Sequence, residues 1–413
     1  MNSADRSAFI TGIGVVGPQG SGWQGVCNAL RSPRPLFKHV PPTWLQYPGG
    51  PDGFIAPLPS ELEPELAQFE TVATDRASAM ALMAAQQAWS QAQPTVQGER
   101  AGVFWGTGMG GLHTAETSYN RLLVDHAPLR PTTVVRIMGN SAAAQLAMKY
   151  QLRGPNHTYS VACASSAQAL GEALIALRSG RIDVALVGGS ESMLVPGVMT
   201  AWGALKVLST RKTAESAALA CRPFSARRSG LVIGEGAAAL VLESAAHARA
   251  RGARPLAVLS GYGSSCDASS LVHPSMQGQA RAMRDALADS GLSPTDIDTV
   301  SAHATGTGTG DVVEAEALRE VFGERVPPVC ATKSIHGHLL GAAGALQAAF
   351  AVASLTEQLI PATLGVEPVD PKCAHLDLGS GVPRAARLTQ VLSNSFAFGG
   401  ANISLVFRQA DAS

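Results

Sequence analysis

One pattern occurs twice along the 413-residue chain and constrains its fold more than any other feature. In each copy a short β-prone run leads through a turn into a helix rich in alanine and glycine, once around Cys163 and once over residues 329–358. Leu170, Leu174 and Leu177 of the first copy have the spacing of a single helix face. The small residues around them predict helices that pack closely on every side. A duplicated unit of this kind indicates two similar α/β halves, with chemistry where the two helices begin.

The rest of the chain alternates between helical and strand-like patterns. Helical patterns cover residues 75–93, 140–150, 245–251 and 278–290, and strand-like runs cover residues 184–187, 236–243 and 297–302. This alternation predicts the α/β class. Because the length exceeds that of one ordinary domain, we place a boundary after Gly252. The first half is then residues 1–252, with the cysteine, and the second half is residues 253–413.

Composition argues against several kinds of partner. Basic and acidic residues are equal at 31 each, so no basic excess favours nucleic acid. The six cysteines are scattered without a CxxC pair, as expected in a reducing compartment. The first residues lack an apolar signal core, and no run of 18 apolar residues predicts a membrane span. We therefore expect a soluble protein of the cytoplasm.

Two glycine-rich stretches match the G-x-G-x-x-G pattern of dinucleotide-binding loops, residues 12–17 and 106–111. Pro18 follows the first stretch, and no acidic residue stands where a ribose would need one. Pro128 and Pro131 interrupt the strand expected after the second stretch. An NAD(P)-dependent oxidoreductase stays an alternative that rests on these two matches alone.

Cys163 is the candidate nucleophile. It stands where the β-prone run gives way to a helix, so unpaired backbone N–H groups and the positive end of the helix dipole would lie near its sulfur. Both favour a thiolate over a thiol with the ordinary pKa of about 8.5. The alternative is a small core cysteine that fills a tight corner between strand and helix.

Three stretches of the second half could meet this cysteine. They are residues 301–311 with His303, residues 331–344 with Lys333 and His338, and residues 393–402 with Phe398. Each could instead be structural, because a single histidine at a strand end is more often a satisfied core residue than a catalyst. His336 and His338 are spaced as a metal pair, but the sequence nearby offers no third ligand, so we expect no metal.

Together these stretches resemble the signatures of the β-ketoacyl–acyl carrier protein synthases, specifically the elongating, synthase II-like condensing enzymes of the thiolase superfamily. The resemblance runs from Ile10 almost to Phe407. Its motifs are the Cys163 turn, Arg222-Pro-Phe with Gly230 to Gly236, the His303 stretch, Lys333 to Gly344, and Asn394 to Asn402. The resemblance implies a thiolase-like fold, in which two duplicated α/β halves form a layered αβαβα arrangement.

The resemblance also implies an activity, that of an acyltransferase. Cys163 would take an acyl chain from a carrier protein and condense it with malonyl-acyl carrier protein by decarboxylative Claisen chemistry, extending a fatty acid, polyketide or polyene chain by two carbons. His303 and His338, as neutral imidazoles, would hold the malonyl thioester carbonyl. Lys333 would supply positive charge and hold His303, with Glu314 as its ionic support. No separate cofactor is implied, because the substrates carry the phosphopantetheine arm.

Further roles follow from the same resemblance. The backbone N–H groups of Cys163 and Phe398 would form the oxyanion hole. Phe398 would act as a gate, with Gly399 and Gly400 as its hinge. The implied substrate contacts are Thr305 and Thr307 to the pantetheine arm and Met109 along the acyl tunnel.

The sequence departs from the family pattern at several positions, which are Ser225, Ser229, Ser301, Ala304 and Ala397. These changes keep the catalytic groups but leave the choice between a fatty-acid, a polyketide and a polyene pathway open. The expected partners are an acyl carrier protein and a second ketosynthase-like chain, as a homodimer or a heterodimer, with the strand at residues 159–162 in the interface. A non-catalytic, chain-length-determining partner subunit is the alternative function, although such subunits typically lack the cysteine.

Overall fold

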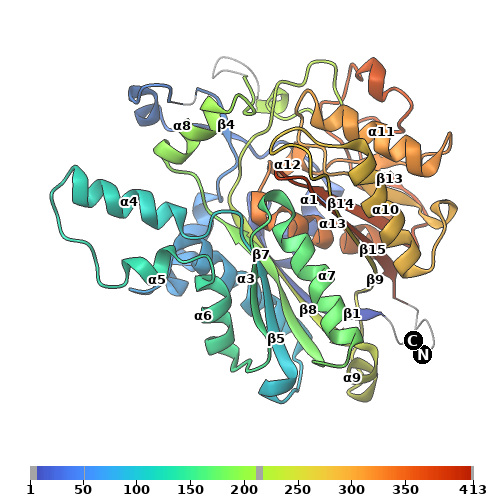
Figure 1. Ribbon diagram of the computed structural model, residues 1–413, viewed down its shortest axis with the longest axis horizontal. Helices are drawn as coiled ribbons and strands as arrows, with labels where there is room; N and C mark the ends of the chain where they lie inside the picture. Colours follow the sequence, from blue (N-terminus) through green and yellow to red (C-terminus); the bar gives the residue numbers. More distant parts are fainter. Residues whose placement is uncertain (1–6, 51, 211–216, 411–413) are drawn as a thin grey trace.

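The computed structural model describes residues 7–50, 52–210 and 217–410 (Figure 1). Its strands form two arrays with the same connectivity. The first has the order β6-β5-β7-β8-β1, and the second has the order β11-β10-β14-β15-β9. In both arrays the two strands farthest from the molecular centre run parallel to their neighbours, and the remaining pairs are antiparallel.

Within each array, the strands follow one another along the chain in the same order. The first array comprises β1 (Ala8–Gly17), β5 (Ala101–Gly106), β6 (Asn156–Tyr159), β7 (Val184–Glu191) and β8 (Gly236–Ser244). The second comprises β9 (Ala257–Cys266), β10 (Thr299–Ser301), β11 (Val329–Cys330), β14 (Gln390–Phe396) and β15 (Ala401–Gln409). Short antiparallel pairing of Ala8–Ile10 with Ala257–Leu259 joins the arrays. The repeated strand order confirms the duplication predicted from the sequence.

Helices lie in three layers around the two arrays (Figure 1). The outer face of the first array is covered by α3 (Arg76–Ala92) and α6 (Ser141–Tyr150), and that of the second by α10 (Met276–Ser290) and α11 (Gly310–Phe322). The middle layer contains α1 (Gly22–Arg31), α7 (Ser165–Arg178) and α13 (Ala343–Glu357). This is the predicted αβαβα arrangement.

The middle layer is close-packed because its helices have small side chains. Ala167 of α7 meets Gly344 of α13, where an added Cβ would lie 2.6 Å from the Ala167 backbone nitrogen. The window Leu340–Glu357 is long and apolar enough by composition to cross a membrane, yet 89% of it is buried inside the protein. Its apolarity is therefore that of a helix packed in the core.

The remaining elements are shorter or stand at the periphery. They are β2 (Gly20–Ser21), β3 (Lys38–His39), β4 (Phe54–Ile55), β12 (Leu359–Ile360), β13 (Arg384–Ala385), α2 (Glu63–Leu66), α4 (Leu112–Leu123), α5 (Thr133–Ile137), α8 (Pro196–Ala204), α9 (Ala245–Ala250) and α12 (Lys333–His336). In Figure 1, α4 and α5 extend away from the body of the molecule. The helix expected at residues 75–93 begins at an Asp75 cap, whose carboxylate accepts the Ala77 N–H at 2.9 Å.

The first glycine-rich stretch belongs to β1 and forms no dinucleotide-binding loop. Gly12 and Gly14 face α3, where an added Cβ would lie 2.1 and 1.9 Å from the carbonyl oxygens of Ala88 and Ala84. These glycines therefore allow a helix to pack directly on the strand backbone. Residues 12–17 therefore give no support to the oxidoreductase alternative.

Candidate active site

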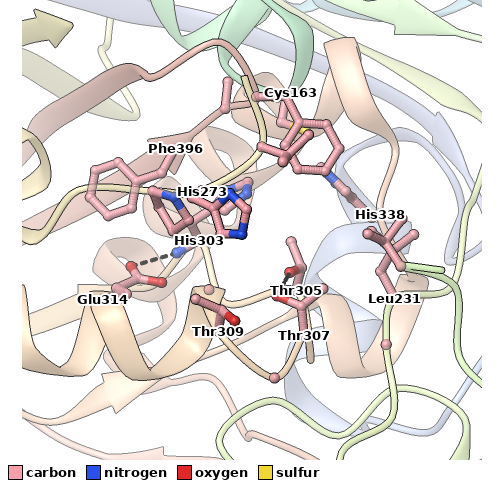
Figure 2. A pocket seen from close by; sticks show the side chains of 18 of the residues that line it. Cys163, Leu231, His273, His303, Thr305, Thr307, Thr309, Glu314, His338 and Phe396 are labelled. Carbon is pink, nitrogen blue, oxygen red and sulfur yellow. Dashed lines mark hydrogen bonds between the residues drawn. The ribbon is translucent and has the colours of Figure 1, made fainter. Parts of the chain in front are cut away.

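A cavity of about 370 Å³ lies where the two halves meet, and residues from both line it. Cys163 comes from the first half, and His303 and His338 come from the second. Figure 2 shows Thr305 and Thr307 on the side of the hollow opposite Cys163. The duplicated fold thus brings together residues that are far apart in the sequence.

Cys163 sits in a 3₁₀ turn, Ala162–Ala164, immediately before α7. Ala162 has a left-handed backbone, with φ of 48°. The Ser165 hydroxyl stabilises this turn by donating to the Ala162 carbonyl at 2.7 Å and accepting the Val161 N–H at 3.0 Å. The strand expected at residues 159–162 ends at Tyr159, and Val161 packs half-buried against the central core.

The Cys163 thiol is buried, and this changes its expected protonation. Burial raises its pKa to about 12, although Lys333 and the backbone N–H groups of Phe398 and Cys163 act in the opposite direction. The backbone N–H groups lower the pKa as predicted, but loss of solvent outweighs them, so burial favours the thiol over the predicted thiolate. The two backbone N–H groups that contact the sulfur are those predicted for the oxyanion hole.

The two histidines face each other across the cavity. Their ring centroids lie 5.4 Å apart at an interplanar angle of 83°, and one nitrogen of each ring and the Cys163 sulfur all lie within 4.8 Å of one another. The Leu340 N–H donates to His338 Nδ1 at 3.4 Å, so the ring proton belongs on Nε2. Burial and the Lys333 charge lower the pKa of both imidazoles well below the ordinary value, which keeps them neutral.

The same tautomer bears on the metal question, since Cys163, His303 and His338 could supply three ligands. A metal on His338 Nε2 would move the ring proton to Nδ1, where it would meet the Leu340 N–H. His336 turns elsewhere: its Nε2 lies 3.1 Å from Thr332 Oγ1, and its ring stacks on Phe350. The hydrogen bond at His338 Nδ1 therefore suits an N–H donor at His338 Nε2 better than a metal.

Lys333 is fully buried beneath the histidines. Its ammonium donates to the His303 carbonyl at 2.6 Å and to Gln347 Oε1 at 2.7 Å. Burial lowers its pKa, and the charges of Glu314 and other acidic groups act against this. Gln347 is a site residue that the sequence reasoning missed, because a single glutamine within an apolar helix has no motif of its own.

Glu314 supports the site differently from the prediction. Its carboxylate accepts the backbone N–H groups of His303 and Ala304 at 2.8 and 2.7 Å (Figure 2). Within the described ranges, no ion pair joins Glu314 to Lys333, although the Glu314 charge still favours the charged ammonium and supports it from a distance. Glu314 acts by holding the main chain that carries His303, and its pKa is raised by burial.

Glu191, at the end of β7, is a second group that the sequence reasoning missed. Its buried carboxylate accepts the N–H groups of Gly108, Met109 and Gly341 at 2.6, 3.2 and 3.0 Å. The second glycine-rich stretch, residues 106–111, therefore surrounds a carboxylate of the protein itself and not a nucleotide phosphate. The oxidoreductase alternative thereby loses its structural basis.

The predicted gate and tunnel residues occupy different surroundings. The Phe398 ring stacks on Trp202 of α8, with centroids 6.1 Å apart at 20°. Gly399 and Gly400 have φ of 83° and 77°, a left-handed conformation that favours glycine. Met109 lies outside the cavity lining and is 48% exposed. The hydroxyls of Thr305 and Thr307 lie 3.1 Å apart on the cavity wall.

Comparisons with known proteins agree with this geometry. The family profile "Beta-ketoacyl synthase, N-terminal domain" matches residues 5–248, and "Beta-ketoacyl synthase, C-terminal domain" matches residues 256–367. "Nodulation protein E" of Rhizobium sp. (strain N33) is 38% identical over 98% of this chain and 100% of its own length. "3-oxoacyl-[acyl-carrier-protein] synthase 2" of Staphylococcus aureus (strain COL) is 33% identical over 99% and 100%.

A solved structure has the same architecture. "The ishigamide ketosynthase/chain length factor" superposes with a TM-score of 0.89 at 30% identity, covering 98% of this chain and 100% of that one. The fold is thus the thiolase-like fold of condensing enzymes, as predicted. The chain belongs to the β-ketoacyl synthase family.

Proposed function

We propose that this chain catalyses decarboxylative condensation of an acyl group on Cys163 with a malonyl thioester. The observation that carries the proposal is one buried thiol facing two neutral imidazoles, with all their reactive atoms within 4.8 Å. His338 Nε2 and His303 Nδ1 have no hydrogen-bond partner among the described residues. His338 Nε2, which carries the ring proton, is thus a buried donor left open, and such a donor suits a substrate oxygen.

The first step transfers an acyl group to the enzyme. The Cys163 sulfur attacks the thioester carbonyl of an acylated carrier, and the tetrahedral oxyanion accepts the N–H groups of Cys163 and Phe398. When this intermediate collapses, the carrier leaves as a thiolate and takes up the proton that Cys163 gives up. The high pKa of the resting thiol is therefore compatible with exchange of one thioester for another.

The second step forms the new carbon–carbon bond. His303 and His338 donate N–H groups to the malonyl thioester oxygen while carbon dioxide leaves, which stabilises the resulting enolate. The enolate carbon attacks the acyl–Cys163 carbonyl, the carbon–sulfur bond breaks as the tetrahedral intermediate collapses, and the Cys163 thiolate takes up a proton from water. These steps need no separate cofactor. Lys333 contributes positive charge beneath the forming enolate, and burial together with this charge keeps both imidazoles neutral.

A carrier protein with a phosphopantetheine arm is the proposed substrate carrier. The Thr305 and Thr307 hydroxyls on the cavity wall support this role, since they suit the amides of such an arm. Met109 as an acyl-tunnel residue, the Phe398 gate and the boundary after Gly252 stay proposals. A cytoplasmic location also stays a prediction.

We also propose a dimer that pairs through β6. Within the described part of the chain, only β5 pairs with this strand, so its other edge is open. The carbonyls of Pro155 and Tyr159 face β5, where they accept N–H groups at 2.8 and 3.0 Å. Because strand residues alternate, the Thr158 backbone between them faces the open edge. The partner would be a second copy or a related subunit of the chain-length-factor kind.

The test is Cys163→Ala, assayed with acyl- and malonyl-carrier substrates. Condensation should be lost, because no thioester can form, while slow malonyl decarboxylation should persist on the remaining histidines. Mass spectrometry of the parent should show an acyl adduct on Cys163. A Cys163→Ala protein that condenses at the parental rate would refute the proposal. Retention of Cys163, His303, Lys333 and His338 favours this activity over a non-catalytic partner subunit.

A further inference from the structure

Gln347 lies in α13, and its side chain is completely buried beneath the active site. Its amide nitrogen donates to the carbonyls of Ala302 and Asn394 at 3.1 and 3.2 Å. Its amide oxygen accepts the Lys333 ammonium at 2.7 Å. The two amide N–H bonds join α13 to the residue after β10 and to β14, and the third contact joins α13 to Lys333 at the start of α12.

These contacts fix which end of the amide faces Lys333. A side-chain amide has two N–H donors and one carbonyl oxygen. Both donors are used by main-chain carbonyls, so a flipped amide would place its oxygen against the carbonyls and its NH₂ against the ammonium. The acceptor that meets Lys333 is therefore a neutral carbonyl held in one orientation.

The nearby carboxylates are occupied elsewhere. Glu314 accepts the main-chain N–H groups of His303 and Ala304, as described above. Asp311 accepts the main-chain N–H groups of Phe224 and Gly306 at 2.8 and 3.1 Å. Among the described residues, no carboxylate lies within ion-pair distance of Lys333.

We propose that Gln347 is a positioning residue whose neutral amide directs the Lys333 ammonium onto the His303 segment and leaves that ammonium able to give up its proton. A carboxylate at position 347 would hold the proton firmly. The amide holds the ammonium in the position that a carboxylate partner would give it, but it adds no negative charge. Any consequence for malonyl decarboxylation rests on the function proposed above, whereas the titration of Lys333 does not.

Several groups face Lys333 and would influence that titration. The acidic groups and thiols that favour its charged form are Glu314, Asp311, Cys163 and Cys221. The histidines whose own charge Lys333 opposes are His303, His336 and His338. Burial opposes the charged ammonium, and the Gln347 and His303 carbonyls are its direct acceptors. Removing one acceptor should therefore weaken proton binding, and adding a carboxylate should strengthen it.

The test is a direct titration of Lys333 by NMR in protein with ¹³C-labelled lysine. The chain has six lysines, so Lys333 can be assigned by the signal missing from a Lys333→Met variant. The parent signal should titrate clearly below the value of about 10.4 for a solvated lysine. Gln347→Met should lower the midpoint further, and Gln347→Glu should raise it by roughly one to three pH units.

Gln91→Met and Gln91→Glu are the matched controls, since Gln91 lies on α3 and its oxygen accepts the Ile13 N–H. Both should leave the Lys333 midpoint unchanged. A parent midpoint at or above 10.4, or folded Gln347 variants with an unchanged midpoint, would overturn the proposal. If neither Gln347 variant folds, Gln347→Asn keeps an amide but shortens its reach, and an unchanged Lys333 midpoint in that variant would overturn the proposal.

Activity provides a second readout that separates this proposal from the proposed function. In a Cys163→Ala background, the alkaline limb of malonyl decarboxylation should follow the NMR midpoint of Lys333 in the parent and in both Gln347 variants. A shifted NMR midpoint without any decarboxylation would refute the proposed function and keep the role of Gln347. If the alkaline limb of the decarboxylation rate has the same pH midpoint in the parent and in both Gln347 variants, the role of Gln347 is refuted and the proposed function stands.

Discussion

Replacing Glu191 by glutamine should make the stability of the protein less dependent on pH. Burial raises the pKa of this carboxyl from 4.5 to about 7, despite the hydrogen bonds from Gly108, Met109, Gly341 and Thr107 that favour its charged form. A folded pKa above the unfolded value means that folding favours the protonated carboxyl. Its stabilising contribution is complete below pH 4.5 and is lost as the pH rises through 7.

The size of the effect follows from the two pKa values. A difference of about 2.5 units corresponds to about 3 kcal/mol in the free energy of unfolding, at about 1.4 kcal/mol per unit. Roughly 2 kcal/mol of this falls between pH 5 and 7.5. Glutamine has the same shape and no charge to lose. Its oxygen can accept from Gly108 and Gly341, but its NH₂ would face the Met109 N–H, at a cost of about 1–3 kcal/mol at every pH.

The assay measures the free energy of unfolding in urea for the parent and for Glu191→Gln, at about pH 5 and about pH 7.5 and at one protein concentration. The variant should gain about 2 kcal/mol relative to the parent between pH 5 and 7.5, whatever its constant offset. Comparing the two proteins cancels the titration of Asp311 and Glu314, which are also buried. A difference between parent and variant that does not change with pH would refute the reasoning.

Three further outcomes are expected. Alkylation of Cys163 by iodoacetamide should keep accelerating about tenfold per pH unit beyond pH 9, because burial raises its pKa to about 12; a plateau near pH 8.5 would contradict this. His338→Ala should slow condensation by about two or more orders of magnitude while Cys163 still accepts acyl groups, and EDTA should leave the parent unaffected. Loss of activity in EDTA that zinc restores would instead indicate a metal site. Thr158→Pro removes an outward N–H from β6, so analytical ultracentrifugation should show monomers; an unchanged dimer mass would place the interface elsewhere.

The sequence predicted those parts of the molecule that are repeated or carry a recognisable motif. The duplicated strand-and-helix unit indicated the layered fold, and the resemblance brought Cys163, His303, Lys333 and His338 to one site. The parts that the sequence did not reveal depend on burial. The helix start at Cys163 suggested a thiolate, but the local sequence does not show that the sulfur is shielded from water.

The sequence also did not predict hydrogen bonds between residues that lie far apart along the chain. Glu191 is separated from Gly341 by 150 positions, yet its carboxylate is bonded to that loop. Glu314 was assigned to Lys333 because a buried lysine needs an acid, whereas the structure uses Gln347 for that contact. Which acceptor a buried ammonium meets is decided by packing between helices, and packing has no linear signature.

The contact of Gly344 with Ala167 links the packing of the middle layer to the geometry of the active site. α7 begins just after the nucleophile, and α13 begins a few residues after His338. The spacing of these two helices therefore sets how far the thiol stands from its facing N–H donors. A single methyl group added at Gly344 would push against backbone and widen that gap, although it touches no substrate. The distance between the thiol and its facing donors is in this sense set inside the core, by how closely α7 and α13 approach each other at Ala167 and Gly344.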